Sequence, residues 1–512
     1  MARVTIGSMT KWEAGSAPSA GCPRADSPYA NRYCEDMTES EAQESVDVIV
    51  IGGGAVGENA AQYAIEGTDL TAVIVEGHLL GGECSYYACM PSKALLRPVD
   101  VAGLTEDLGG IVPTRLDRDG MLSRRDSFVS DYDDSSQVEW AESAGIRVVR
   151  GHARLVGERS VRIEADDDAA RTLTARHAVI LATGSEPSIP SEFDGAHPWT
   201  SADATGVVET PESIAIVGGG VVACEAAVWF NALGSRVTLL VRGSGLLSGN
   251  EPFAGDTVLD GLRASGVEVV LGASVTKCTR SDAEDTGLGR VHGGPVHLET
   301  SAGTVDVAEV LVATGRTPRL RDVGLDAVGL SADDVLHEKL PAWLRAVGDA
   351  SGDVPLTHWG KYRARVIGAR IKAAATGAPA PYEVENPPVP QVVFTQPQVA
   401  QTGLTEASAR DRGIDVVTAE VPYNGAAGAA LLRDTVSGKA KIVVDRETRC
   451  LVGATFAGPD AGEQLHAATI AITGKVPVHV LRHAVPSYPT VSELWLRLLE
   501  ELPEDMRRPA AG

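Results

Sequence analysis

Two glycine-rich loops, far apart in the sequence, constrain the fold of this chain more than any other feature. The first, Gly52-x-Gly54-x-x-Gly57, follows the β-branched segment 46–51 and precedes an alanine-rich segment and a second hydrophobic run that ends at Glu76. Strand, glycine loop, helix, strand and acid in this order are typical of a βαβ unit that binds a dinucleotide. The glycines permit a tight turn and let the backbone approach a pyrophosphate at the helix N-terminus.

The same pattern returns later in the chain. Segment 214–217 precedes Gly218-x-Gly220-x-x-Ala223, and the next hydrophobic run ends at Arg242. Two such units imply two dinucleotides. A carboxylate after the second strand suits a free ribose 2′-hydroxyl, whereas an arginine suits a 2′-phosphate. We therefore expect FAD at the first loop and a nicotinamide nucleotide at the second, with NADPH favoured over NADH; the alternative for Arg242 is a surface residue at a strand end.

A closely spaced cysteine pair, Cys84 and Cys89, lies between the two loops and is followed by Pro91-Ser92-Lys93. On a regular helix, residues five apart differ by about 7.5 Å in rise, beyond the roughly 7 Å that a disulfide spans between Cα atoms. If the two cysteines pair, the backbone between them is a loop or a distorted turn. Pro91 suits the first turn of a following helix, near which a thiolate is stabilised. The alternative is two unpaired, buried cysteines.

Composition excludes several classes of function. The chain of 512 residues has a net charge of −24, which argues against nucleic acid and anionic membranes as partners. No apolar run reaches about 18 residues, so no transmembrane helix is expected. Seven cysteines in so long a chain are not a secreted disulfide framework, which favours the cytoplasm. No metal site is predicted.

The rest of the chain divides by composition and by strand pattern. Residues 1–44 are expected to be a disordered or non-native extension, with translation from Met37 as one possibility and no role for Cys22 or Cys34. Two strands that end in Ala-Thr-Gly, at Gly184 and Gly315, mark the crossings between nucleotide domains. The fold class is α/β: two Rossmann-like nucleotide-binding domains and a C-terminal α+β domain. The expected boundaries are 45–190 with 317–386 for the FAD domain, 191–316 for the NAD(P) domain, and 387–505 for the last domain.

Taken together, these motifs resemble the flavin-dependent pyridine nucleotide–disulfide oxidoreductases, the family of dihydrolipoamide dehydrogenase, mycothione reductase and mercuric reductase. The resemblance runs from about residue 45 to residue 500, with the motifs in the family's order. It implies FAD, NAD(P)H, a homodimer with the active site completed across the interface, and a small-molecule substrate. It also identifies 387–505 as the dimerisation domain.

The resemblance assigns roles to individual residues. The segment Gly82-x-Cys84 to Cys89-x-Pro-Ser-Lys93 resembles the redox-active disulfide, with Cys84 meeting substrate and Cys89 beside the flavin. Lys93 would carry positive charge near the flavin and pair with Glu225. Asp349 and Thr357 resemble contacts to the ribityl chain and the flavin ring, although Asp349 is also a candidate helix N-cap.

One residue departs from the family pattern. The family's acid–base segment His-Pro-Thr-x-x-Glu is here Tyr488-Pro-Thr-x-x-Glu493. Histidine exchanges protons near neutral pH, whereas tyrosine is a poor base there. Disulfide exchange needs a thiolate and a proton for the leaving thiol, so turnover is expected to be slower by about 100- to 10,000-fold. His483 is an alternative acid–base group, although a structural role is favoured for it, and Glu493 could simply begin a helix.

The main hypothesis is an FAD-dependent enzyme that passes electrons from NAD(P)H through the flavin to the Cys84–Cys89 disulfide and on to a disulfide substrate. The alternatives are a reductase of quinones or other acceptors, a mercuric reductase, and a non-catalytic redox-responsive flavoprotein. The chain ends without the extra cysteine pair usual in mercuric reductases.

Overall fold

The computed structural model describes residues 44–165 and 170–509, and every element below belongs to them. The extension expected over residues 1–44 lies outside this part, apart from Glu44, with which strand β1 (Glu44–Ile51) begins. Within the described residues, no helix is both long and apolar enough to cross a membrane.

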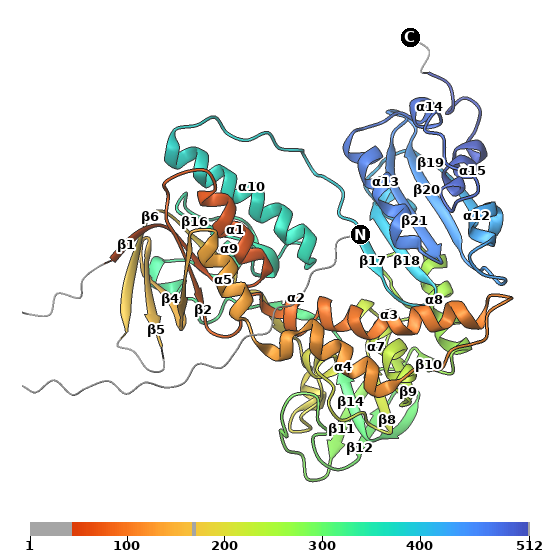
Figure 1. The fold of residues 1–512 in the computed structure, drawn as a ribbon, viewed down its shortest axis with the longest axis horizontal. Coiled ribbons are helices and arrows are strands. Elements are labelled where there is room, and N and C mark those ends of the chain that lie inside the picture. The colour runs from red at the N-terminus through yellow and green to blue at the C-terminus, as the bar shows by residue number, and fades with distance from the viewer. Residues whose placement is uncertain (1–43, 166–169, 510–512) are drawn as a thin grey trace, which may run out of the picture. The chain divides into compact units, whose positions relative to one another are not determined.

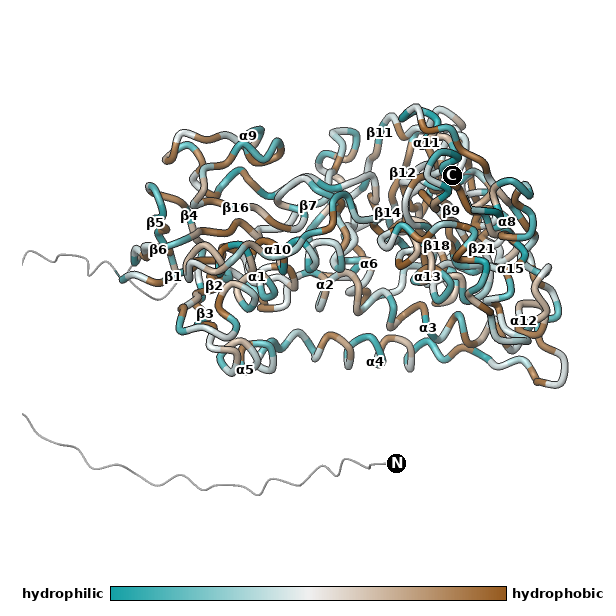
Figure 2. Tube along the Cα trace, turned by 90° about the horizontal axis from the view of Figure 1, so that it is seen from above, coloured by the Kyte–Doolittle hydropathy of each residue, from teal (hydrophilic) through white to brown (hydrophobic). Residues whose placement is uncertain are grey.

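The first glycine loop belongs to a seven-stranded sheet. Strand β1 is central and runs parallel to β2 and β6, with Ile51 opposite Val75 and Leu181, so that three strands end together beside the loop. Buried valines and isoleucines fill β1, and hydrophobic residues, brown in Figure 2, follow the strands of this sheet. The strands lie in the order β3 (Ile146–Arg150), β2 (Ala72–Glu76), β1, β6 (Arg171–Leu181), β5 (Ser160–Glu164), β4 (His152–Gly157), with β16 (Leu344–Ala346) also paired to β6.

Two helices from distant parts of the chain lie side by side against this sheet, α1 (Ala55–Ile65) and α10 (Thr357–Thr376) (Figure 1). Glycines allow their close contact. A Cβ on Gly360 would lie 2.6 Å from a methyl group of Val56, and one on Gly368 would lie 2.9 Å from the backbone nitrogen of Ala64. The helix that follows the glycine loop is therefore held against the helix that begins at Thr357.

The second glycine loop lies at the end of β8 (Ser213–Val217) in an all-parallel sheet with the order β10-β9-β8-β14. Its helix, α7 (Val221–Ala232), is buried over most of its length. A three-stranded antiparallel sheet follows. The remaining bounds are β9 (Arg236–Val241), α8 (Pro252–Ala264), β10 (Glu268–Leu271), β11 (Val275–Arg280), β12 (Val296–Thr300), β13 (Gly303–Val307) and β14 (Glu309–Val312).

The chain passes twice between the sheets that carry the two glycine loops, directly after the two Ala-Thr-Gly segments. The two passages pair with each other as the short antiparallel strands β7 (Ser185–Pro187) and β15 (Arg316–Pro318). Gly184 and Gly315 directly precede these two strands, with φ values of +71° and +135°. Other residues would be strained at such angles, so glycine allows the chain to turn at both points.

The C-terminal part is an antiparallel sheet of five strands with helices, as the strand-then-helix pattern indicates. Its core contains Phe456 packed against Trp495, with ring centroids 5.4 Å apart. The elements are β17 (Gln391–Val393), β18 (Gln398–Gly403), α11 (Glu406–Asp411), β19 (Val416–Pro422), α12 (Ala427–Ala430), β20 (Lys439–Asp445), β21 (Leu451–Gly458), α13 (Ala461–Thr473), α14 (Val478–Leu481) and α15 (Glu493–Glu501).

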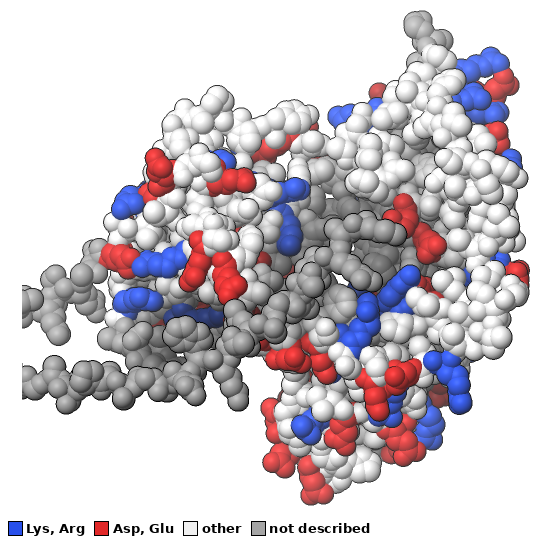
Figure 3. Space-filling view, viewed as in Figure 1, with Lys and Arg blue, Asp and Glu red and all other residues white. Residues whose placement is uncertain are grey.

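Acidic side chains are prominent on the face in Figure 3, notably at its lower end over β11 and β12. The loop between these strands contains exposed Asp282, Glu284 and Asp285. Such a surface agrees with the net charge of −24 and disfavours an anionic partner there.

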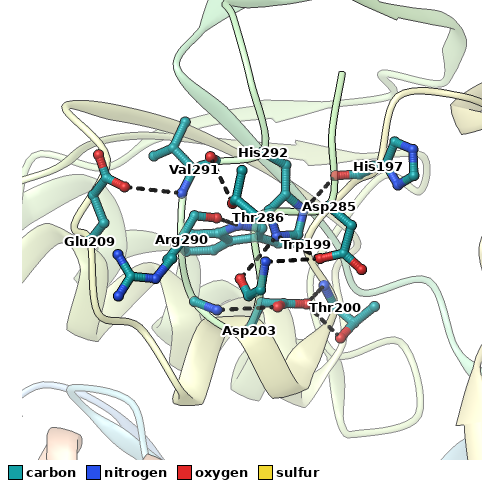
Figure 4. Close-up of polar contacts among 12 residues, drawn as sticks. His197, Trp199, Thr200, Asp203, Glu209, Asp285, Thr286, Arg290, Val291 and His292 are labelled. Atoms are coloured by element: carbon teal, nitrogen blue, oxygen red, sulfur yellow. Dashed lines mark hydrogen bonds and ion pairs between the residues drawn. The ribbon is translucent and has the colours of Figure 1, made fainter. Parts of the chain in front are cut away.

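The stretch 281–294, which resembles a plain surface loop in the sequence, is partly built into the fold. His292 is 6% exposed, and its two ring nitrogens face the backbone oxygens of His197 (3.0 Å) and Gly287 (3.3 Å). The indole of Trp199 donates to the backbone oxygen of Arg290 at 2.7 Å (Figure 4). The buried side chain of His292 thus anchors an otherwise polar loop. The local composition of the loop does not predict this.

The interpretation of Asp349 as a helix N-cap needs correction. The strand before it, β16, ends at Ala346. Asp349 lies in a short 3-10 helix (Gly348–Ser351) whose N-cap residue is Val347, so Asp349 is not an N-cap. The positive φ of Gly348, +63°, ends the extended backbone early.

Candidate functional site

A single large cavity joins the two glycine loops and the cysteine pair. Its volume is about 2150 Å³, several times that of a pocket for one small ligand. The residues predicted for the site that line it are Gly52, Gly54, Glu76, Gly82, Cys84, Cys89, Lys93, Gly184, Gly218, Gly220, Glu225, Arg242, Gly315, Asp349 and Thr357.

The first loop can hold a pyrophosphate only because it lacks side chains. Gly52 has φ = +100°, and a Cβ on it would lie 2.4 Å from the backbone oxygen of Ala182. A Cβ on Gly57 would lie 2.1 Å from the oxygen of Gly52, so the third glycine serves close packing rather than the cavity wall. Gly82 approaches Gly54 from the next segment, and a Cβ there would lie 2.7 Å from the Gly54 Cα atom. These contacts fit a dinucleotide whose phosphates lie on bare backbone.

Glu76, at the end of β2, stabilises the same loop. Its Oε2 accepts a hydrogen bond from the backbone nitrogen of Gly53 at 2.6 Å, and its Oε1 accepts one from His78 at 2.7 Å. The carboxylate is thereby fixed at the cavity wall, where an acidic residue can bind ribose hydroxyls.

The second loop repeats this geometry. Gly218 has φ = +141°, and a Cβ on it would lie 2.4 Å from the backbone oxygen of Ala313. Ala223 is fully buried beneath the loop and does not line the cavity. Arg242 follows β9 directly and its side chain is exposed at the cavity rim, where it is free to meet an anionic group.

The two cysteines lie on consecutive helices rather than on one. Cys84 is in the short helix α2 (Gly82–Tyr86), and Cys89 begins α3 (Cys89–Glu106). Between them Tyr87 and Ala88 have non-helical backbone, with φ of −130° and −139°. This break is the distorted turn that the five-residue spacing demands of a pair, and Pro91 lies in the first turn of α3.

Cys84 and Cys89 are both free thiols, and they share a hydrogen bond. Cys89 Sγ also lies 3.3 Å from the hydroxyl oxygen of Thr357, the first residue of α10. The hydrogen bonds from Cys84 and Thr357, together with the Lys93 charge, lower the pKa of Cys89 to about 6. The same shared hydrogen bond, with burial, raises the pKa of Cys84. Of the two sulfurs, Cys89 is therefore the thiolate at neutral pH.

Lys93 is fixed by two partners from distant segments. Its Nζ lies 2.7 Å from Oε2 of Glu225, a residue of α7 whose side chain is buried. The ammonium also lies 4.9 Å from the ring centroid of Phe394. The other oxygen of Glu225 accepts a hydrogen bond from the backbone nitrogen of Phe394 at 2.9 Å. Glu225 thus joins the cysteine-bearing helix α3 to the start of the C-terminal sheet.

Asp349 accepts a hydrogen bond from the hydroxyl of Ser185 at 2.5 Å, beside the passage between the two sheets. Ser185 in turn accepts one from Arg316 Nε at 2.7 Å. Arg316 also reaches Glu83, the residue before Cys84, with Nη2 2.5 Å from the carboxylate. A polar chain therefore connects the passage strands to the helix that carries Cys84.

Tyr488 and Glu493 do not share the cavity that Cys84 and Cys89 line. Tyr488 is 77% exposed, and neither residue lines the cavity. Glu493 begins α15, is buried, and accepts a hydrogen bond from the backbone nitrogen of Gly428 at 3.3 Å. His483 lies two residues beyond the short helix α14 (Val478–Leu481). It is exposed and does not line the cavity either.

Reasoning from the sequence missed several residues around the cysteines. Tyr87 lines the cavity and stacks on Tyr132, with ring centroids 5.4 Å apart. Glu58, directly after the last glycine of the first loop, is 7% exposed, and its Oε1 lacks a hydrogen-bond partner among the described residues. An acidic residue in the first turn of an alanine-rich helix was the available signal for Glu58. Nothing in the sequence links Tyr132 to Tyr87. The described residues contain no group of three or more His, Cys, Asp and Glu side chains able to hold a metal ion.

Comparison with protein families gives two matches. Residues 46–339 match the pyridine nucleotide-disulphide oxidoreductase family, and residues 389–498 match the dimerisation domain of pyridine nucleotide-disulphide oxidoreductases.

Individual proteins match over most of the chain. The dihydrolipoyl dehydrogenase of Chlamydia trachomatis serovar D is 30% identical over 88% of this chain and 96% of its own length. A mercuric reductase of Staphylococcus aureus is 27% identical over 90% of this chain and 83% of its own length. Among solved structures, the HOCl-induced flavoprotein disulfide reductase RclA from Escherichia coli shares the fold, with a TM-score of 0.75 and 22% identity over 89% of this chain and 100% of its own.

Proposed function

The chain belongs to the pyridine nucleotide–disulphide oxidoreductase family, and we propose that Cys84 and Cys89 are its redox-active pair. It is an FAD-containing, NAD(P)H-dependent oxidoreductase of the disulfide type. FAD, when bound, accepts a hydride from the nicotinamide and returns electrons to a disulfide. The observation that carries the assignment is the position of both sulfurs in the wall of the cavity that joins the two nucleotide loops.

We assign Cys84 to the substrate and Cys89 to the cofactor side. Cys89 begins α3 and contacts Thr357, and its lowered pKa of about 6 makes it the resident thiolate. In exchange, the Cys84 sulfur attacks a substrate disulfide RS–SR, so that a Cys84–SR bond forms and RS⁻ leaves and takes a proton. The Cys89 thiolate then attacks the Cys84 sulfur, the second RS⁻ leaves, and the Cys84–Cys89 disulfide forms. Lys93, held by Glu225, keeps positive charge beside this pair.

We assign the FAD domain to 45–190 with 317–386, the NAD(P) domain to 191–316 and the dimerisation domain to 387–505. The FAD site would use the bare backbone of the first loop and of Gly82, with Glu76 for the ribose and Asp349 and Thr357 farther along the cavity. The NAD(P) site would use Gly218, Gly220, Ala223 and Gly315. Exposure of Arg242 at the rim supports NADPH over NADH, because a guanidinium binds a 2′-phosphate.

The acid–base part of the site is proposed to come from a second subunit of a homodimer. Tyr488 is exposed in a segment of the dimerisation region and does not line the cavity of its own chain, which suits a contribution to a partner's Cys84. Glu493, fixed by Gly428, would hold that segment in place. The substrate is proposed to be a small molecule with a disulfide. The cytoplasm is proposed as the compartment, because seven cysteines in a chain of 512 residues are not a secreted disulfide framework.

The decisive experiment is anaerobic titration of the FAD-loaded protein with NADPH, followed by visible spectroscopy of the wild type, Cys84→Ser and Cys89→Ser. We expect four electrons per subunit in the wild type, two for FAD and two for the cysteine pair, and two in either variant. A long-wavelength thiolate–flavin band should appear in the wild type and Cys84→Ser and be absent in Cys89→Ser. Equal electron uptake in all three proteins would overturn the assignment. Turnover with lipoamide, low-molecular-weight disulfides and quinones then identifies the acceptor.

A further inference from the structure

The segment 243–250 connects Arg242 to helix α8 and contributes to the cavity wall beside the second glycine loop. Leu247 and Gly249 are among its lining residues. The backbone nitrogen of Leu247 donates a hydrogen bond to the backbone oxygen of Gly219 at 2.9 Å, so the segment is tied to the glycine loop itself. Leu247 has φ = +50°, a left-handed conformation that is uncommon for residues other than glycine. Such a backbone persists only where surrounding contacts hold it in place.

One of these contacts is made by Gln401 of β18, in the C-terminal sheet. Its Nε2 donates a hydrogen bond to the backbone oxygen of Gly249 at 3.3 Å, and its Oε1 accepts one from the backbone nitrogen of Glu251 at 3.2 Å. The side-chain amide therefore satisfies one acceptor and one donor of the main chain. Through these two bonds, the C-terminal sheet holds the end of the segment directly before α8.

Glu251, the N-cap residue of α8, provides a second attachment to the same sheet. Its side chain is only 4% exposed, and its Oε2 lies 2.9 Å from Nζ of Lys441 on β20. Its Oε1 accepts a hydrogen bond from the backbone nitrogen of Glu406, the first residue of α11, at 2.7 Å. Lys441 also lies 2.7 Å from Oε2 of Glu406. A buried carboxylate needs such partners to compensate for its lost hydration, so Glu251 is bound firmly to the C-terminal sheet.

Gln401 and Lys441 belong to one row across this sheet. Thr455 of β21 lies between them, because it is the register partner of Gln401 on one side and of Lys441 on the other. Side chains that are opposite each other on neighbouring strands lie on the same face. The hydroxyl of Thr455, which is buried, donates a hydrogen bond to Oε1 of Gln401 at 3.2 Å. The row therefore presents an amide and an ammonium to the same short piece of chain.

We propose that Gln401 and Lys441 are positioning residues for the nicotinamide nucleotide. They hold the segment 243–250 and, through Leu247, keep the glycine loop in the conformation that binds the pyrophosphate. Neither residue lines the cavity, so the C-terminal sheet sets the affinity of this site without touching the nucleotide through them. The effect is common to NADPH and NADH, because both contain the pyrophosphate, whereas Arg242 acts on the 2′-phosphate alone. The inference rests on the proposed nucleotide site at the second glycine loop.

The test is anaerobic stopped-flow reduction of the FAD-loaded protein, followed by flavin absorbance over a range of NADPH or NADH concentrations. The half-saturating concentration reports nucleotide binding, and the limiting rate reports hydride transfer. In Gln401→Ala and in Lys441→Met, we expect the half-saturating concentration of both nucleotides to rise by about three- to tenfold, because each variant removes hydrogen bonds that hold the segment. The limiting rate should change by less than about twofold, since these bonds act on binding.

Three comparisons separate positioning from a general loss of structure. Lys441→Arg keeps the positive charge and should bind both nucleotides more tightly than Lys441→Met. Lys439→Met is the matched control, because Lys439 lies on the same strand but pairs with Glu420 of β19 at 2.8 Å, and it should leave both parameters unchanged. Gln401→Ala leaves no buried charge unpaired, so it gives an answer even if Lys441→Met does not fold.

Unchanged half-saturating concentrations in Gln401→Ala and Lys441→Met would overturn this inference alone. A rise confined to NADPH, or an equal rise in Lys439→Met, would do the same, because the effect would then not act through the pyrophosphate loop. A wild-type protein whose flavin neither nucleotide reduces would overturn the proposed function and this inference with it.

Discussion

Lys93 Nζ lies 2.7 Å from Glu225 Oε2, and the second oxygen of the same carboxylate binds the backbone nitrogen of Phe394. Three segments that are distant in the sequence, the cysteine helix α3, the helix of the second nucleotide loop and the first strand of the C-terminal sheet, therefore meet at one carboxylate. Glu225 is buried and Lys93 is partly exposed. The carboxylate therefore needs its partners to compensate for its lost hydration, more than the ammonium does.

Replacement of Lys93 tests this dependence. We expect Lys93→Met to destabilise the protein by about 1–3 kcal/mol, because it leaves the buried carboxylate of Glu225 with only the backbone donor of Phe394. Because the side chain of Lys93 is partly exposed to water, the loss is smaller than for a fully buried pair. Glu225→Gln should cost less, because an amide keeps the oxygen that Phe394 needs. The measurement is urea unfolding of both variants and of the double variant. Additive losses, with no coupling energy between the two positions, would contradict a direct pair.

Arg242 should decide which nicotinamide nucleotide is used. Arg242→Leu is expected to lower kcat/KM for NADPH by about 10- to 100-fold, because it removes a charge-assisted contact to phosphate. The kcat/KM for NADH should change by less than about twofold, because NADH lacks this phosphate. The matched control is Arg236→Leu, at the other end of β9, where the arginine pairs with Glu212 on the surface. A parallel loss with both nucleotides would show that Arg242 supports the fold of the loop instead of reading the phosphate.

Tyr488→His should restore an acid–base group. We expect turnover of a disulfide substrate to rise by about tenfold or more, and its pH profile to acquire a transition near pH 6.5, because imidazole exchanges protons there. Tyr488→Phe serves as the control for shape, and its turnover should be no higher than that of the wild type. His483→Ala tests the alternative base. Steady-state rates across pH give the answer, and a Tyr488→His protein no faster than Tyr488→Phe would count against a role for this position.

Glu58 should make stability depend on pH. Its pKa is raised from 4.5 to about 7 in the folded protein, so between these values the folded state holds a proton that the unfolded chain has released. Stability therefore falls as pH rises through this window, by at most about 3 kcal/mol, and levels off above it. Glu58→Gln should flatten this part of the curve. The check is chemical unfolding of both proteins at about pH 5 and about pH 8. If the free energy of unfolding falls equally between the two pH values in both proteins, Glu58 is excluded as the source.

The two nucleotide loops illustrate what could be predicted before the structure was known. Gly52 and Gly218 are in each case preceded by a β-branched segment, and the spacing to the next glycine is the same. Backbone conformations with positive φ, here +100° and +141°, are open to glycine and strained for other residues. Local chemistry thus specifies these turns, and the hydrophobic strands on either side follow.

The surroundings of the cysteines could not be predicted in the same way. Thr357 contacts Cys89, and Phe394 contacts Lys93, from segments that pack together only in the complete fold. Thr357 and Glu225 were found through the family resemblance. Tyr132, which stacks on Tyr87, has no such motif, because nothing in the sequence links these two residues.

The glycine loops, the spacing of Cys84 and Cys89 and the family of the chain were determined by the sequence alone, because each depends on neighbouring residues. Which sulfur is the thiolate, and which charges face it, was decided by the tertiary structure. Those properties depend on burial and on Coulomb interactions, which arise only when α1, α3, α7 and α10 come together around the pair.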